Sequence, residues 1–577
     1  MTNAPELWGG IECTVNRVSD NFHDQLRRGG HDRRPCDLER IAALGIRRLR
    51  YPVLWERVAP RAPNDRDWRW TDQRLKRLRE LGIEPIVGLL HHGSGPRYTD
   101  LLDDNFPQLF ADYASAVAAR YPWVRSYTPI NEPLTTARFS ALYGHWHPHK
   151  SDDRSFVRVL VNQCKATVLA MREIRTVNPS AQLIQTDDVG YTSSTENLAY
   201  QASFDNERRW LGWDLLCGRV DARHPLWDYL LNSGFRAGDA EFFLDHPCPP
   251  DIIGVNHYVT SDRHLSERRR LFPPETWGGN GRHRYADVAA VRALPRDGSG
   301  LTGTLRDAWD RYRLPLAITE VHLGCTREEQ LRWLWQAWNS ARQLRASGMD
   351  LRAVTAWALF GSFDWNSLLT RDDGYYEPGA FDVRGPTPRR TALAKLITAL
   401  TTGAEFHPAV LLEQPGWWQR SNRLFATLGT VEQLWPRDIG GSTLLIIGGA
   451  IILRRRLEQV CRARGLRIRI YDQSDVTERT AERVLSELRP WASIELMSHS
   501  NGNDVLANAC ARQRIPFLSF PRLNAVATST TLDLLHTALD LLIDGETHRW
   551  EELGQPYSTS GNPLFEPPAE PMPLPAR

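Results

Sequence analysis

The chain has 577 residues, enough for an α/β barrel of about 250 residues or more together with a smaller unit. Hydrophobic residues make up 41% and charged residues 24%, which is ordinary for a globular protein, and the net charge of +2 gives no reason to expect a nucleic-acid partner. The longest apolar stretch, residues 444–453, is too short to cross a bilayer, so no membrane association is expected.

The eight cysteines are scattered along the chain, and no two have the C-x-x-C spacing of zinc or redox motifs, so we expect no metal site. The first residues, MTNAPELWGG, lack the basic and then apolar pattern of a secretory signal. Together these observations predict a cytoplasmic protein with reduced thiols.

From the start to about residue 400, short apolar runs alternate with amphipathic segments. Continuous apolar strands that alternate with helices predict a parallel sheet covered by helices, and eight such units predict a closed (β/α)8, or TIM, barrel. The eight runs begin at Trp8, Ile46, Glu84, Val124, Gln182, Asp251, Pro315 and Ala353.

Four regions are expected along the chain. Residues 1–404 form the barrel, and residues 405–441 form an irregular connector packed on it. A second, smaller α/β unit follows at 442–555. Residues 556–577 are rich in proline and are expected to be extended or disordered.

Most of the predicted strands end in a polar or ionisable residue. In a barrel of this kind the carboxyl ends of all strands open onto one face, where active sites lie. We therefore expect side chains that are distant in sequence to converge there. The residues at these ends are His91, Asn131, Asp187, Asn256 and Glu320.

Two strand-end motifs carry the chemistry. TPINEPLTT places Glu132 after the fourth strand, and PLAITEV places Glu320 at the end of the seventh. Cleavage of a glycosidic bond with retention needs two carboxyl groups about 5–5.5 Å apart, one to attack the anomeric carbon and one to move the proton. The motifs resemble T-x-N-E-P and I-T-E-N-G of glycoside hydrolase family 1, and the resemblance extends over about residues 7–400. It implies a β-glucosidase-like retaining β-glycosidase in which Glu132 is the acid/base and Glu320 the nucleophile.

Further segments resemble this family and imply supporting roles. RRLRYPVLWERVAP is similar to R-F-S-x-x-W-x-R, which implies that Arg50 lies beside Glu320 and keeps it ionised. GVNHYVTS is similar to G-x-N-Y-Y, which implies that the Tyr258 hydroxyl lies near Glu320. Asn131 is implied to contact the 2-hydroxyl of the sugar.

The resemblance also implies a set of sugar-binding residues. The segments that carry it are WGGIECTVNRV, GLLHHGSGP, GVNHYVTS and AWALFGSFDWNS. Trp357 would lie under the sugar ring as a platform, and the other members would bind hydroxyl groups. The implied set is Asn16, His91, Asn256, Trp357, Asp364 and Trp365.

Several positions depart from the family pattern. Asn16 stands where the family has Gln and Asp364 where it has Glu, so both side chains are one methylene shorter. His92 replaces a Trp, and the I-T-E motif is followed by Val321 and His322 instead of Asn-Gly. Because displaced hydrogen bonds to a hydroxyl can change selectivity steeply, glucoside specificity is not carried over to this chain.

The segment TLLIIGGAIILRRRLEQV begins a strand–turn–helix–strand pattern. It resembles the start of a Rossmann domain of the dTDP-dehydrorhamnose reductase type. Dinucleotide binding there needs G-x-x-G-x-x-G, of which only Gly448 remains, with Ile451 and Arg454 in the other two positions. We therefore expect a truncated, degenerate Rossmann-like domain that binds no cofactor and serves packing, dimerisation or covering of the barrel.

Four functions are compatible with these patterns. The first is hydrolysis of a terminal β-linked sugar, with a small β-glycoside or oligosaccharide as the binding partner. The second is transglycosylation by the same Glu132 and Glu320. A sugar-nucleotide oxidoreductase and a non-catalytic sugar-binding protein are disfavoured by the missing glycines and by the presence of both glutamates. Homo-oligomer formation is left open.

Overall fold

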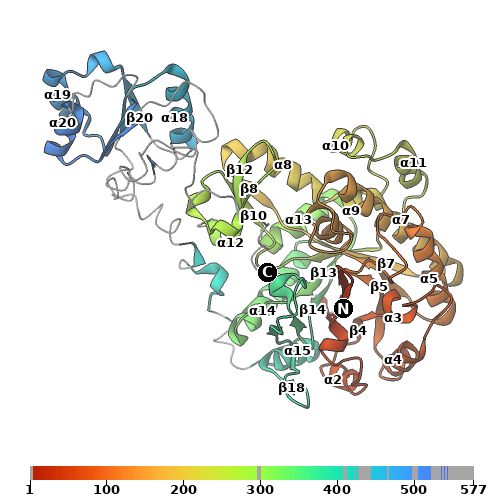
Figure 1. Cartoon of the computed structure of the whole chain (residues 1–577). Helices are drawn as coiled ribbons and strands as arrows, with labels where there is room; N and C mark the ends of the chain where they lie inside the picture. The colour runs from red at the N-terminus through yellow and green to blue at the C-terminus, as the bar shows by residue number, and fades with distance from the viewer. Residues whose placement is uncertain are drawn as a thin grey trace.

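The computed structural model describes residues 4–294, 300–406, 412, 414–420, 423–425, 443–463, 467–496, 505–520, 535, 538–539 and 542 (Figure 1). Eight parallel strands close into a barrel in the order β1-β14-β13-β9-β7-β6-β5-β4, which confirms the predicted fold. Each of the eight predicted runs overlaps one of these strands. They are β1 (Glu6–Gly10), β4 (Arg48–Pro52), β5 (Glu84–His91), β6 (Ser126–Asn131), β7 (Gln182–Asp188), β9 (Ile252–Asn256), β13 (Leu316–Val321) and β14 (Leu351–Ala356).

Helices surround this barrel and bury one face of each against it. Helix α4 shows why the sequence folds this way: Thr71, Arg74, Leu75 and Leu78 are its buried residues, and they recur at the spacing of one helix face. The main covering helices are α2 (Asp37–Ala42), α4 (Arg69–Glu80), α5 (Phe106–Arg120), α7 (Asp153–Val177), α13 (Gly300–Tyr312), α14 (Arg327–Ala346) and α15 (Ala392–Thr402).

The inside of the barrel is filled by side chains from six of its strands. Trp8 is the largest of them and is fully buried. This layer makes the barrel a packed core and leaves the carboxyl ends of the strands to form the site. The cluster consists of Trp8, Ile86, Ile184, Ile252, Ala317 and Ala353.

A small four-stranded sheet in the order β11-β12-β10-β8 was not predicted. Its strands come from the segments that follow β7 and β9, so it is an addition to the loops of the barrel. Because these strands have three to six residues each, their apolar periodicity is too short to recognise in the sequence. They are β8 (Thr192–Ser194), β10 (Arg263–Ser266), β11 (Trp277–Gly279) and β12 (Arg284–Ala289).

Other short elements occupy the remaining loops. The helices are α1 (Gln25–Arg28), α3 (Trp55–Val58), α6 (Pro133–Ala137), α8 (Ala199–Arg208), α9 (Leu211–Leu216), α10 (Trp227–Asn232), α11 (Ala237–Asp245) and α12 (Ala290–Ala293). The strand pairs are β2 (Val15–Val18) with β3 (Asn21–Asp24), β15 (Ser362–Phe363) with β16 (Tyr376–Glu377), and β17 (Phe381–Asp382) with β18 (Arg389–Arg390).

The second unit contains a parallel sheet in the order β20-β19-β21-β22. Helix α18 packs on one face of this sheet, and α19 and α20 pack on the other. The predicted strand–helix–strand start is therefore present. The elements are β19 (Leu444–Gly448), α18 (Ile451–Ala463), β20 (Ile468–Tyr471), α19 (Glu478–Leu488), β21 (Ala492–Leu496), α20 (Val505–Gln513) and β22 (Phe517–Phe520).

Part of the predicted connector packs on α14. Trp418 is buried, and its indole N–H donates to Gln336 at 2.8 Å. The backbone amide of Trp417 donates to Glu329 at 2.9 Å. Much of the connector and the whole predicted tail, residues 556–577, lie outside the described residues. Within the described ranges, no helix combines the length and the apolar composition needed to cross a membrane.

Candidate active site

Glu132 lies between the end of β6 and helix α6, and its side chain is fully buried. Its backbone has φ 47° and ψ 63°, a left-handed conformation that costs a non-glycine residue roughly 1–2 kcal/mol. Asp187 helps to hold this turn, because its carboxyl group accepts hydrogen bonds from the amides of Leu134 (3.1 Å) and Thr135 (3.4 Å). Strained backbone that the surroundings hold in place is typical of functional sites.

Glu320 lies near the end of β13 and is also buried. The Arg50 guanidinium donates to its Oε1 at 2.8 Å, and the Tyr258 hydroxyl donates to its Oε2. Arg50 is itself buried, at 5% exposed, so this ion pair is shielded from water. Both carboxyl oxygens of Glu320 are therefore held in place by hydrogen bonds, one of them charge-assisted.

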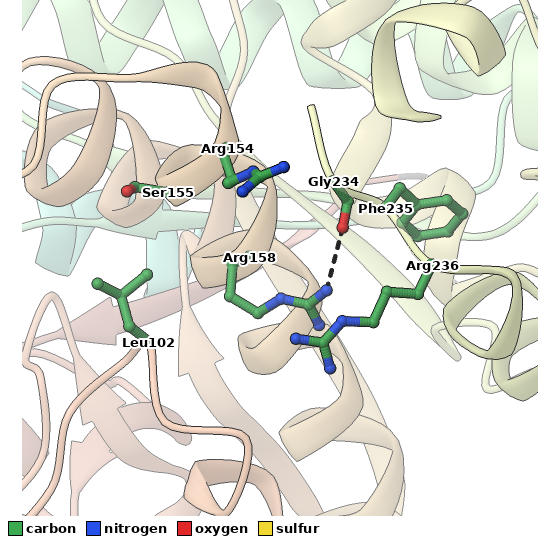
Figure 2. A pocket seen from close by; sticks show the side chains of 7 residues that line it. All are labelled: Leu102, Arg154, Ser155, Arg158, Gly234, Phe235 and Arg236. Atoms are coloured by element: carbon green, nitrogen blue, oxygen red, sulfur yellow. Dashed lines mark hydrogen bonds between the residues drawn. The ribbon is translucent and has the colours of Figure 1, made fainter. Parts of the chain in front are cut away.

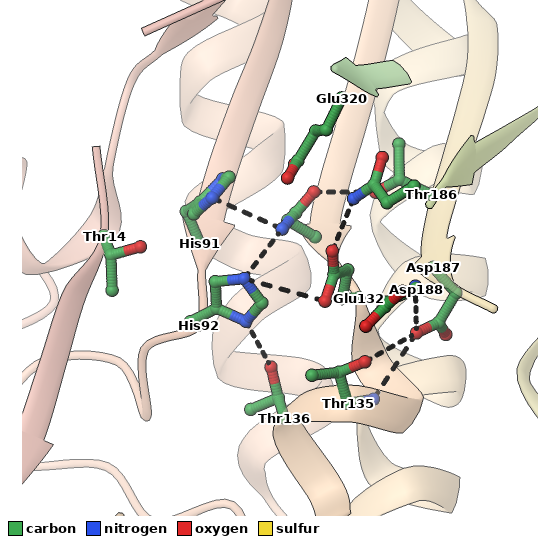
Figure 3. A network of polar contacts seen from close by, with 12 residues as sticks. Thr14, His91, His92, Glu132, Thr135, Thr136, Thr186, Asp187, Asp188 and Glu320 are labelled. Atoms are coloured by element: carbon green, nitrogen blue, oxygen red, sulfur yellow. Dashed lines mark hydrogen bonds and ion pairs between the residues drawn. The ribbon is translucent and has the colours of Figure 1, made fainter. Parts of the chain in front are cut away.

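One polar network joins the two glutamates, and Figure 3 shows the part of it around Glu132. Arg50 donates through its second nitrogen to the amide oxygen of Asn131 at 2.5 Å, so it contacts both Glu320 and the residue that precedes Glu132. Asn256, which is the register partner of Glu320 on β9, donates its side-chain amide to Glu132. The two carboxyl groups therefore belong to one buried polar cluster at the carboxyl ends of the strands.

Two histidines at the end of β5 border the same cluster. The side-chain amide nitrogen of Asn131 lies 3.3 Å from a ring nitrogen of His91 and 3.2 Å from one of His92. Another contact places His92 Nε2 3.8 Å from Glu132 Oε2. Burial, followed by the charges of His92 and Arg50, lowers the pKa of His91 well below its ordinary value. The His91 imidazole is therefore neutral near pH 7.

Trp357 forms an aromatic wall next to these groups. Its ring stacks on His91 with centroids 5.5 Å apart and planes inclined by 13°. The Arg50 guanidinium lies 4.6 Å from the ring centroid. Gly10 on β1 allows this placement, because a Cβ atom there would lie 2.2 Å from an edge carbon of Trp357. The predicted sugar platform is thus held against Arg50, the ion-pair partner of Glu320.

Of the remaining predicted sugar ligands, Trp365 and Asp364 contact charged residues, whereas Asn16 does not. The indole N–H of Trp365 donates to the carboxyl group of Glu12 at 3.0 Å. Asp364 adopts φ 54° and pairs with Arg28 at 2.5 Å. Asn16 is fully buried, and among the described residues both polar atoms of its amide lack a hydrogen-bond partner.

Four residues of the site were not identified from the sequence. Thr186 donates to Asn131 at 2.8 Å, and Thr319 donates to Asn256 at 2.6 Å. Arg28 pairs with Asp364, and Glu12 accepts from Trp365. Only Glu12 carried a usable signal, because it is an acidic residue inside an apolar run. No group of three or more His, Cys, Asp or Glu suited to a metal ion occurs in the part of the chain that the structure describes.

A cavity of about 530 Å³ lies elsewhere, between the start of α7 and the segment that precedes α11 (Figure 2). Arg154, Arg158 and Arg236 line it. The guanidinium of Arg158 pairs with Asp239 at 3.0 Å and that of Arg236 with Asp104 at 3.0 Å, so much of this positive charge is already balanced. None of the predicted site residues lines this cavity.

The sequence of residues 15–376, more than half of the chain, matches the sequence model of glycosyl hydrolase family 1. The chain belongs to this family. Among similar proteins, β-glucosidase 4 of Oryza sativa subsp. japonica is 23% identical over 412 residues, which cover 64% of this chain and 84% of that protein. An aryl-phospho-β-D-glucosidase of Bacillus subtilis (strain 168) is 22% identical over 365 residues, which cover 58% of this chain and 76% of that protein.

The family 1 barrel is also similar to solved structures. The β-glucosidase from Thermotoga maritima in complex with cyclophellitol superposes with a TM-score of 0.57 at 16% identity. That match covers 70% of this chain and 99% of the other. At this identity the likeness shows the fold, and the family match shows that the chain is a glycosyl hydrolase.

Proposed function

We propose that this family 1 member is a retaining β-glycosidase that hydrolyses a terminal β-linked sugar through a glycosyl-enzyme intermediate. Glu320 attacks the anomeric carbon while Glu132 donates a proton to the leaving oxygen. Glu132 then takes a proton from water, which attacks the anomeric carbon, breaks its bond to Glu320 and releases the sugar. For this double displacement the two carboxyl groups must lie about 5–5.5 Å apart.

The observation that carries the proposal is the difference between the surroundings of the two carboxyl groups. Glu320 accepts hydrogen bonds from a buried guanidinium and a phenol, and these donors stabilise an anionic nucleophile. Glu132 is fully buried and accepts from the neutral amide of Asn256. Burial removes the hydration that a carboxylate needs and so favours the protonated acid that the first step requires.

The other residues would bind and orient the sugar. Trp357, stacked on His91 beside Arg50, supports the role of a platform under the ring. The neutral His91 imidazole and the Asn131 amide could each bond a hydroxyl group. The buried, unpartnered amide of Asn16 supports a role in substrate binding, because an unmet hydrogen bond there costs about 1–3 kcal/mol until a ligand supplies it.

Asp364 and Trp365 form a second set of proposed sugar ligands. Asp364 and Trp365 are the predicted partners of the hydroxyls farthest from the reacting carbon, and both already contact charged residues, Arg28 and Glu12. Their hydrogen-bonding capacity is thereby reduced. This supports a sugar specificity that differs from that of β-glucosidases with longer side chains at the Asn16 and Asp364 positions.

The test combines an activity screen with a nucleophile variant. The protein should release nitrophenol from at least one member of a panel of 4-nitrophenyl β-glycosides. Glu320→Ala should abolish this turnover, and added azide should restore it and give a glycosyl azide of inverted configuration. Near-normal activity of Glu320→Ala would show that the nucleophile has been misassigned.

The second unit is proposed to be a degenerate Rossmann-like domain without a dinucleotide. Arg454 donates to the carbonyl of Gly448 at 2.7 Å and pairs with Asp472 at 2.5 Å. It therefore bridges the glycine turn after β19 and the acidic residue after β20, the two places that a Rossmann dinucleotide would contact. Titration with NADH or NADPH should leave the coenzyme fluorescence unchanged, whereas saturable enhancement would contradict the proposal.

A further inference from the structure

His322 follows directly after strand β13, two positions beyond Glu320. Its Nδ1 lies 3.2 Å from the backbone carbonyl oxygen of Trp357, and its Nε2 lies 2.9 Å from Oε2 of Glu377. Little of either side chain reaches solvent, with 9% of His322 and 7% of Glu377 exposed. One imidazole therefore joins the end of the strand that carries Glu320 to two segments that come later in the chain.

The chemistry of the two contacts decides where the donors are. A carbonyl oxygen can only accept, so Nδ1 of His322 is the donor to Trp357. The other contact needs one proton between Nε2 and the carboxyl group of Glu377, and either partner can supply it. Two hydrogen bonds thus run from the Trp357 carbonyl through the imidazole to Glu377. Removal of either side chain breaks this link.

The residues that follow Glu320 hold both backbone polar groups of Trp357. The Trp357 amide donates to the carbonyl of Val321 at 3.2 Å, and the Trp357 carbonyl accepts from His322. The peptide unit that carries the proposed sugar platform is therefore attached to the end of β13. Because the indole extends from this peptide and stacks on His91, a shift of the peptide would move the platform relative to Glu320.

Glu377 extends the link to the hairpin that carries Asp364. It belongs to β16 and pairs with Ser362 of β15, two residues before Asp364. The backbone amide of Asp364 donates to the carbonyl of Tyr375 at 2.8 Å, and the Tyr375 amide donates to the Asp364 carboxyl group at 2.8 Å. The position of this proposed sugar ligand therefore depends on where Glu377 is held.

Two positions in the sequence make the link possible. His322 stands where the family motif has glycine, which has no side chain that could form it. Gly324 in turn leaves room for Glu377, because a Cβ atom there would lie 2.4 Å from the carboxyl carbon. The link is therefore a property of this chain and not of the motif that it resembles.

We propose that His322 and Glu377 are positioning residues, which hold the platform Trp357 and the hairpin of Asp364 in place relative to Glu320. This inference rests on the proposed glycosidase function and assigns part of the substrate affinity to a contact outside the reacting groups. A platform under the ring contacts the sugar in the ground state as well as in the transition state. Its displacement should therefore raise KM more than it lowers kcat.

The first experiment measures kcat and KM separately on the nitrophenyl glycoside that the protein hydrolyses fastest. His322→Ala and Glu377→Leu each remove one half of the link and should raise KM at least about fivefold. Glu377→Gln should stay within about threefold of the wild type, because the new amide can donate to Nε2 while Nδ1 still donates to Trp357. An unchanged KM in both disruptive variants, or equal increases in Glu377→Gln and Glu377→Leu, would overturn the proposal.

His224→Ala provides the matched control. His224 lies between α9 and α10 and also contacts a buried carboxyl group, that of Asp214 at 3.3 Å, with side chains 3% and 0% exposed. Neither is a predicted site residue. Loss of folded protein lowers kcat through the active fraction, so the KM of His224→Ala should stay within about twofold of the wild type. A rise equal to that of His322→Ala would show that destabilisation alone explains the effect.

Hydrogen exchange followed by mass spectrometry tests the link without catalysis. Peptides that contain Trp357 and Asp364 should exchange at least about tenfold faster in His322→Ala and Glu377→Leu than in the wild type. Glu377→Gln and His224→Ala should exchange there at the wild-type rate. Unchanged exchange in His322→Ala would overturn the proposal whatever the activity. If exchange accelerates as expected but the wild type hydrolyses no glycoside, the hydrolysis proposal fails while the link from β13 to Trp357 stands.

Discussion

Arg50 on β4 donates a 2.8 Å hydrogen bond to the carboxylate of Glu320, which follows 270 positions later in the chain on β13. The two strands are not neighbours in the barrel, so the bond crosses its mouth. The other end of the guanidinium binds Asn131, directly before Glu132. One arginine therefore fixes the geometry on which the proposed double displacement depends.

Replacement of Arg50 by methionine should lower kcat/KM by at least about a hundredfold, because loss of one partner from a buried ion pair typically costs 3–5 kcal/mol. Steady-state kinetics on the best nitrophenyl glycoside would measure this. Arg48→Met is the control, since Arg48 is on the same strand but pairs with the partly exposed Glu84. Its activity should stay within about twofold of the wild type, and equal losses in the two variants would contradict the specific role of Arg50.

Removal of the Tyr258 hydroxyl should affect kcat more than stability. Tyr258→Phe deletes one donor to Glu320 while retaining the ring. Hydrogen bonds to charged groups contribute about 1.5–3 kcal/mol, so kcat/KM should fall by roughly 10- to 150-fold. Thermal unfolding measured in parallel should show a shift of only a few degrees. If activity is unchanged, the phenol does not stabilise the nucleophile.

The stability of the turn at Glu132 should depend on pH through Asp187. Burial raises the pKa of Asp187 to about 7, against about 3.9 in an unfolded chain. The folded state therefore binds this proton more tightly than the unfolded chain does. The resulting stabilisation of the fold is complete below about pH 4 and is lost as the pH rises through 7. Asp187→Asn has no group that titrates at this position. Between pH 4 and 7 the free energy of unfolding of the wild type should therefore fall by a few kcal/mol relative to that of the variant.

Denaturant unfolding at several pH values measures this difference. The exposed Asp112→Asn serves as a control, and its difference from the wild type should be flat over the same range. A flat profile for Asp187→Asn as well would mean that Asp187 is ionised in the native protein and stabilises α6 as an anion.

Substitution of Gly10 by alanine should displace the aromatic wall. The new methyl group would lie 2.2 Å from Trp357, far inside contact distance, so the indole must move away from His91. Overpacking of this kind costs about 1–3 kcal/mol of stability, and we expect kcat/KM to fall at least tenfold as the platform shifts. Gly278→Ala, where no atom lies within 4 Å of the new methyl group, should change stability by less than about 0.5 kcal/mol. Unaltered kinetics of Gly10→Ala would show that Trp357 does not position the sugar.

The barrel could be predicted because its signals are local. The barrel strands lie in short runs rich in apolar residues, as in EPIVGLLH, which matches β5 from Glu84 to His91. The polar residues at most of the strand ends can be read from the same pattern, and the fold then requires those ends to share one face. The short strands β8, β10, β11 and β12 were missed because they have too few residues to show periodicity.

The sequence by itself determined the alternation of strands and helices and the positions of Glu132 and Glu320, because strand runs and strand-end motifs depend only on neighbouring residues. The tertiary structure alone decided which side chains meet across the pocket. Glu12 contacts Trp365 at a separation of 353 residues, and Arg28 contacts Asp364. Closure of the barrel creates these contacts and the burial that makes their charges effective, and no local pattern encodes either.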